Sequence, residues 1–212
     1  MNREKRFRIS IGLNAALFLM EVYAIYLSVK GHMGLSHMII FYTEDSNILA
    51  CVTSLFYVIS SVKQLKKGTF EPETPAAILR YMATCCLTLT FLVVITILAP
   101  TMGPMGFTFM MMRGSVLYMH NLCPILSLIS FVFFEKPALE KKHTLWAMVP
   151  TFLYAAVSIV LNILRIWHGP YIFLYVYEQP VWMSCIWFVL IVGGAYAMGI
   201  GLRALAKGRK NR

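Results

Sequence analysis

The stretch Phe41-Tyr42-Thr43-Glu44-Asp45-Ser46-Asn47 is followed at once by the apolar run Ile48 to Val62. The run contains no charged residue, and such a segment is typical of a membrane helix. Hydroxyl, carboxylate and amide groups crowd the start of this helix. Polar groups are costly to bury in an apolar environment unless they have partners or a use. The stretch therefore predicts a membrane helix whose first turn is a capping element or a functional site.

The composition of the rest of the chain agrees with a membrane protein. Of the 212 residues, 59% are hydrophobic and 13% are charged, whereas a soluble domain carries about 25% charged residues. The apolar residues form blocks of about 20, enough to cross ~30 Å of hydrocarbon. We predict an all-α, polytopic membrane protein that forms a single domain over residues 1–212. Its six transmembrane helices are expected at about 9–29, 45–66, 76–98, 115–134, 145–167 and 181–205.

The basic residues predict the orientation of the helices. Sixteen of the 19 lie at the two ends of the chain and in the second and fourth connections: Arg3, Lys5, Arg6, Arg8, Lys63, Lys66, Lys67, Arg80, Lys136, Lys141, Lys142, Arg203, Lys207, Arg209, Lys210 and Arg212. Because membrane proteins keep Lys and Arg on the cytoplasmic side, we expect both termini to be cytoplasmic. The net charge of +10 then needs no nucleic-acid partner. The five cysteines lie in apolar runs without metal-ligand spacing, so we expect no metal and no cofactor.

His120 is a second polar residue inside an apolar segment, after the stretch at 41–47. It lies about five residues inside the helix predicted at 115–134, roughly 8 Å below the outer boundary at 1.5 Å per residue. The helix at 45–66 starts on the same side, so Thr43 and His120 are expected at similar depth. Imidazole can take the proton of a threonine hydroxyl, and a carboxylate such as Glu44 or Asp45 can orient the imidazole. Free amides at the helix start can stabilise an oxyanion. Acyl-transfer chemistry is available if the two helices touch.

Structural interpretations of the same residues stay open. Thr43, Asp45 or Ser46 can serve as the N-cap of the helix. His120 can form an interhelical hydrogen bond with no chemical role. Glu21, in the middle of the first helix, must face the bundle or a wet cavity, as a structural pair or a proton carrier. Arg165 can bind a carboxylate head group or extend to the interface.

Three motifs in order along the chain resemble a known family. Phe41-Tyr42-Thr43-x-x-Ser46-Asn47, then His120-x-x-x-Pro124 and the aromatic element Pro170-Tyr171-Ile172-Phe173-Leu174 resemble the androgen-induced and androgen-dependent membrane hydrolases and their bacterial relatives. Animal members hydrolyse fatty acid esters of hydroxy fatty acids. The chain departs from the family pattern at the acidic Glu44-Asp45 pair. It also has Gly169-Pro170-Tyr171 in place of a Tyr-Pro sequence.

The resemblance implies a threonine-dependent lipid hydrolase. Thr43 and His120 match the family's essential pair, with Asp45, Ser46, Asn47 and Arg165 as supporting residues. The expected partner is a membrane lipid or fatty-acyl ester, and the expected location is the plasma membrane or the inner membrane of a bacterium. The sequence indicates no particular protein partner. Two other functions stay open: a lipid acyltransferase, and a non-catalytic lipid- or small-molecule-binding protein or transporter.

Overall fold

The protein is a multi-pass α-helical membrane protein. The computed structural model describes residues 1–31 and 40–207. Within these ranges, six helical spans are long and apolar enough to cross a membrane, as predicted. Four are single helices: α1 (Arg3–Gly31), α3 (Tyr42–Lys66), α9 (His143–Ile163) and α10 (Val181–Ala206). The span Thr74–Thr101 consists of α4 (Thr74–Val93), η1 (Val94–Leu98) and α5 (Ala99–Thr101), and the span Gly114–Glu135 consists of α7 (Gly114–Leu117), η2 (Tyr118–Leu122), α8 (Cys123–Ile129) and η3 (Ser130–Glu135). Two short elements lie between spans: α6, Gly106–Met111, and η4, Ile172–Leu174. The basic residues Arg209, Lys210 and Arg212 fall outside the described ranges.

The helix ends differ from the predicted ones for local reasons. α1 begins at Arg3 rather than near residue 9, and an i,i+4 ion pair of 2.8 Å joins Glu4 and Arg8 in its polar first turns. α9 ends at Ile163 rather than at residue 167, because Arg165 adopts a left-handed backbone conformation with φ 56°. A helix does not continue through such a residue.

Prolines shape two of the spans. The wide π-helical turns η1 and η2 are each followed, two residues later, by a proline: Pro100 and Pro124. η3 precedes Pro137 in the same way. Proline has no amide hydrogen to donate and its ring pushes against the carbonyl four residues earlier, which distorts the preceding turn. Pro150 inside α9 is not preceded by a π-helical turn, and we have no physical account of that difference.

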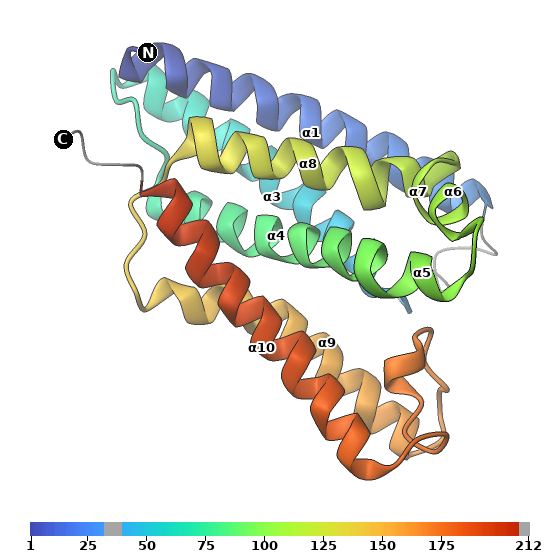
Figure 1. The fold of residues 1–212 in the computed structure, drawn as a ribbon. Coiled ribbons are helices and arrows are strands. Elements are labelled where there is room, and N and C mark those ends of the chain that lie inside the picture. Colours follow the sequence, from blue (N-terminus) through green and yellow to red (C-terminus); the bar gives the residue numbers. More distant parts are fainter. Residues whose placement is uncertain (32–39, 208–212) are drawn as a thin grey trace.

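The spans form two groups (Figure 1). α1, α3, α4 and α8 lie alongside one another, whereas α9 and α10 form a pair that diverges from α4 toward the end marked by α5 and α6. The start of α1 and the end of α10 lie at the opposite end. α4 is the most buried of the six spans.

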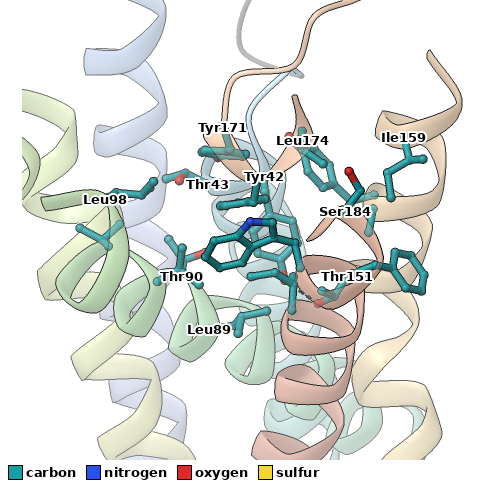
Figure 2. A pocket seen from close by; sticks show the side chains of 18 of the residues that line it. Tyr42, Thr43, Leu89, Thr90, Leu98, Thr151, Ile159, Tyr171, Leu174 and Ser184 are labelled. Atoms are coloured by element: carbon teal, nitrogen blue, oxygen red, sulfur yellow. Dashed lines mark hydrogen bonds between the residues drawn. The ribbon is translucent and has the colours of Figure 1, made fainter. Parts of the chain in front are cut away.

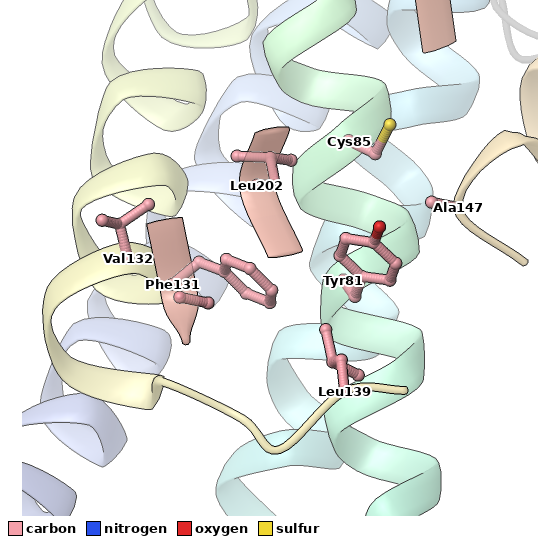
Figure 3. Packing of buried hydrophobic residues seen from close by; sticks show 8 residues of the cluster. Tyr81, Cys85, Phe131, Val132, Leu139, Ala147 and Leu202 are labelled. Carbon is pink, nitrogen blue, oxygen red and sulfur yellow. The ribbon is translucent and has the colours of Figure 1, made fainter. Parts of the chain in front are cut away.

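A cluster of buried side chains joins the two groups near the end where α1 starts and α10 ends (Figure 3). The Tyr81 ring of α4 stacks on the Phe131 ring of η3, with centroids 5.7 Å apart. Leu202 of α10 and Ala147 of α9 pack in the same cluster. Between membrane helices, close packing and hydrogen bonds drive association, since lipid is as apolar as the side chains. The tight contact at this end fixes the angle at which α9 and α10 leave α4.

Gly199 marks the closest approach of α10 to its neighbours. The hydroxyl of Tyr81 donates a hydrogen bond of 2.5 Å to the Gly199 carbonyl. A Cβ at position 199 would lie 3.0 Å from that hydroxyl and 3.2 Å from side-chain carbons of Ala147 and Thr144. We expect Gly199→Ala to destabilise the protein by about 1–3 kcal/mol, the usual cost of overpacking. Thermal unfolding in one detergent measures this effect.

Gly201 provides the matched control on the same helix. A Cβ there would have no neighbour within 4 Å. Gly201→Ala is expected to leave the unfolding temperature unchanged or to raise it slightly, because alanine is a better helix former. Equal unfolding temperatures for the two variants would contradict the packing described at Gly199.

Candidate functional site

The first turn of α3 carries no side-chain cap. Its N-cap is Phe41, in an extended conformation and without a side-chain hydrogen bond to the helix end. The capping interpretation of Thr43, Asp45 and Ser46 is therefore wrong, because all three lie inside the helix. The first α-helical backbone bond runs from the Asp45 amide to the Phe41 carbonyl at 3.2 Å. The amides that precede it lie at the positive end of the helix dipole, where oxyanions bind favourably.

Ser46 and Asn47 hold this turn in place from one helical turn below. Ser46 donates to the Thr43 carbonyl at 2.8 Å and shares a 3.1 Å hydrogen bond with Thr90 of α4. Asn47 donates to the Thr43 carbonyl at 2.7 Å and to the Met119 carbonyl of η2 at 3.3 Å. The helix of Thr43 therefore contacts the helix of His120 one residue away from the histidine. Both supporting residues position backbone rather than present a reactive group.

Thr43 lines an apolar pocket between α3, α4, α9, α10 and the loop after α9 (Figure 2). The pocket contains about 690 Å³ of space free of protein atoms, its open side included. Its walls are aliphatic and aromatic, with hydroxyls from Thr43, Thr90 and Ser184 among the lining residues. Such a pocket is apolar enough for an acyl chain and has a few hydroxyl groups in its walls.

Tyr171 covers the start of α3 from the loop after α9. Its ring stacks on Phe173 at 5.0 Å and meets Phe41 edge-on at 6.3 Å. Burial raises the pKa of the Tyr171 phenol, and the neighbouring Thr43 hydroxyl and the amides of Thr43 and Tyr42 act in the opposite direction. The phenol thus lies against the helix-start amides and the Thr43 side chain. A carbonyl oxygen at this position would meet the amides and the phenol as donors.

His120 is held by the backbone of α6. Its Nδ1 lies 2.5 Å from the Met110 carbonyl oxygen. A carbonyl can only accept, so Nδ1 carries the proton and donates this hydrogen bond. In the neutral ring, Nε2 then has the lone pair that a general base needs. The sequence predicted Glu44 or Asp45 as the orienting group, but the structure places a backbone carbonyl in that position.

The π-helical turn that carries His120 is a second local feature. Pro124 lacks the amide hydrogen that would bond the carbonyl of residue 120. That residue lies in the turn η2, which spans Tyr118–Leu122. Wide turns of this kind are frequent at functional sites.

The helices of Thr43 and His120 touch through Asn47 and Met119, but among the described residues no hydrogen bond joins the Thr43 and His120 side chains. His120 is buried and is not among the residues that line the Thr43 pocket. Catalytic hydrogen bonds of enzymes without substrate are often long and tighten only in the complex. Thr43 acting with His120 therefore requires a shift of one of these side chains.

The remaining candidate residues, Glu44, Asp45 and Arg165, do not line the Thr43 pocket. Asp45 lines a second groove on the neighbouring face of α3. Glu44 is buried and accepts a 3.3 Å hydrogen bond from Ser28 of α1. The guanidinium of Arg165 lies over the Tyr177 ring, 4.6 Å from its centroid, and Arg165 lines neither the pocket nor the groove. Arg165 is exposed and lies outside both cavities.

Sequence reasoning missed the most polar part of the core. Arg80 of α4 and Glu135 at the end of η3 form a fully buried ion pair of 3.2 Å. Asn14 donates to the same Glu135 oxygen at 2.9 Å and Ser130 donates to it at 2.8 Å. The same Arg80 nitrogen, Nη2, also donates a hydrogen bond of 3.0 Å to the Ser127 hydroxyl. Arg80 is therefore a core residue, not the loop cation that the charge count assumed. Its only sequence signal is its place inside an otherwise apolar block.

The fold and the pocket define the class: a six-span α-helical membrane protein with an apolar pocket beside a threonine at a helix start. Comparison with known proteins adds no closer assignment, since no family model, no curated protein and no solved structure matches the chain.

Proposed function

We propose that the protein is an intramembrane hydrolase that cleaves a lipid ester with Thr43 as the nucleophile. The observation that carries the proposal is the position of Thr43. Its side chain lines an apolar pocket, and it lies in the first turn of α3, beside the helix-start amides and the Tyr171 phenol. Nucleophile, oxyanion donors and acyl-chain space thus meet within one helical turn.

In the proposed reaction, His120 Nε2 takes the Thr43 proton as the hydroxyl attacks the ester carbonyl. The carbonyl oxygen becomes an oxyanion that the helix-start amides and Tyr171 stabilise. The alcohol then leaves with the proton returned by His120, and water releases the acyl group by the same steps in reverse. The fixed Nδ1–Met110 contact keeps the ring in the tautomer that this sequence needs. An acyltransferase would differ only in the second acceptor.

The pocket predicts a preference for long acyl chains. Purified protein in nanodiscs is expected to hydrolyse p-nitrophenyl decanoate with a kcat/KM at least about tenfold above that for the acetate, because each buried CH₂ contributes about 0.8 kcal/mol. Release of nitrophenol over empty nanodiscs measures both rates. Equal rates for the two esters would place the reaction outside this pocket.

A transporter is the second candidate, and Glu21 is the observation that favours it. Glu21 is fully buried in the middle of α1, and among the described residues neither of its carboxylate oxygens has a hydrogen-bond partner. Buried ionisable groups at membrane depth mark ion and proton pathways. Absence of ester cleavage in the nanodisc assay, together with liposome uptake of an amphiphile that depends on Glu21 but not on Thr43, would favour this function.

A further inference from the structure

A second groove lies on the other side of Tyr42 from the Thr43 pocket. It contains about 1190 Å³ of space free of protein atoms, its open side included. α3 contributes Tyr42, Asp45, Ser46 and Leu49, which follow the i, i+3, i+4, i+7 spacing of one helix face. The opposite wall comes from α9 and the residues after it: Pro150, Leu153, Tyr154, Val157, Ser158, Leu161 and Trp167. Most of this wall is aliphatic, and it suits a hydrocarbon chain.

Asp45, on the α3 wall, is the one carboxylate among the described residues that line the groove. Its side chain is half-buried, and the ion pairs and side-chain hydrogen bonds found among the described residues do not include it. Removing a carboxylate from water is costly unless a cation or hydrogen-bond donors replace the water. The groove therefore has a negative charge at one point and apolar walls elsewhere.

Three aromatic rings surround the same space. Tyr42 and Tyr154 meet edge-on with centroids 5.2 Å apart. Their hydroxyls are engaged elsewhere, Tyr42 with Thr151 at 2.7 Å and Tyr154 with the Ile40 carbonyl at 2.8 Å, which fixes the rings. Trp167 is the third ring of the lining. Aromatic faces attract ammonium groups, and cages of such rings recognise quaternary ammonium ligands.

The lining also discriminates against phosphate. Among the described residues that form the groove there is no lysine and no arginine, so the groove offers no cation to a phosphate group.

We propose that this groove binds a single-chain amphiphile with an ammonium head and no phosphate, the head between Asp45 and the rings of Tyr42, Tyr154 and Trp167 and the chain along α9. The site is distinct from the Thr43 pocket, because Tyr42 and Tyr154 line both and stand between them, whereas Thr43 does not line the groove. The proposal does not depend on ester hydrolysis.

Radiolabelled dodecyltrimethylammonium tests the proposal directly. Binding to immobilised protein in dodecyl maltoside is expected to be saturable. Asp45→Asn, which keeps the shape of the side chain, should weaken it by about tenfold, since a half-exposed charge contributes on the order of 1.4 kcal/mol. Trp167→Ala should also weaken binding. Thr96→Ala, at an exposed residue that does not line the groove, should bind as the wild type does.

Competition on the wild-type protein needs no variant and therefore no assumption about folding. Dodecanol, which has the chain without the charge, and dodecylphosphocholine, which adds a phosphate, should each compete at least about tenfold more weakly than unlabelled dodecyltrimethylammonium. Equal competition by dodecanol would show that the groove recognises only the hydrocarbon chain, and this would overturn the proposal. Equal competition by dodecylphosphocholine would make it a phospholipid site. Unchanged binding to a folded Asp45→Asn protein would equally overturn the proposal.

Discussion

Thr43→Ala is expected to lower kcat/KM for lipid-ester hydrolysis by at least about 1,000-fold, because removing the nucleophile of a catalytic hydroxyl–histidine pair costs that much or more. His120→Ala is expected to produce a loss of similar size, and the double variant should lose little more than either single one, since the two residues act as a unit. Nitrophenol release in nanodiscs measures all three. Thr43→Ser keeps a hydroxyl and should retain a measurable part of the activity.

Matched controls separate chemistry from general damage. Thr96 is an exposed threonine whose hydroxyl donates to the Leu92 carbonyl at 2.7 Å, and His168 is an exposed histidine paired with Glu178 at 2.7 Å. Thr96→Ala and His168→Ala should keep wild-type rates. Full activity in either Thr43→Ala or His120→Ala would remove that residue from the mechanism.

Removal of either charge from the buried Arg80–Glu135 pair should have the largest effect on stability. Arg80→Met leaves the Glu135 carboxylate in the core with only Asn14 and Ser130 as donors, and Glu135→Gln leaves the guanidinium without a counter-charge. Breaking a buried pair by removing one partner typically costs about 3–5 kcal/mol. Thermal unfolding or reversible unfolding in mixed micelles measures the loss.

The double variant Arg80→Met/Glu135→Gln tests whether the loss of stability in the single variants comes from leaving one buried charge without its partner. It removes both charges while glutamine keeps an acceptor for Asn14, so its loss should be smaller than the sum of the single losses. Arg8→Met is the control, because Arg8 pairs with Glu4 on an exposed surface and such pairs contribute little. A strictly additive double variant would show that the two charges do not interact.

The six spans could be predicted because hydrophobicity over about 20 residues is a property of each segment alone. Their arrangement could not. The divergence of α9 and α10 from α4 depends on the cluster around Tyr81 and on the close contact at Gly199. These contacts join residues that are 118 positions apart in the case of Tyr81 and Gly199. No local pattern encodes such a pairing.

The candidate site, too, could be predicted from the sequence only in part. Thr43, Ser46 and Asn47 stand out in sequence because polar residues are rare at the start of an apolar helix. The carbonyl that orients His120 belongs to Met110, and a backbone group has no sequence signature. The Arg80–Glu135 pair joins residues 55 positions apart, and only the exclusion of water from the assembled bundle reveals that these two charges need each other.

The central claim is that the Thr43 hydroxyl is the reacting nucleophile. The direct measurement is labelling of the purified protein with a fluorophosphonate, followed by tandem mass spectrometry of its peptides. The proposed mechanism predicts one phosphonyl adduct, on Thr43, that is absent from His120→Ala because the hydroxyl is then not activated. An adduct on Ser46 or any other residue, or no adduct in a preparation that hydrolyses esters, would contradict it.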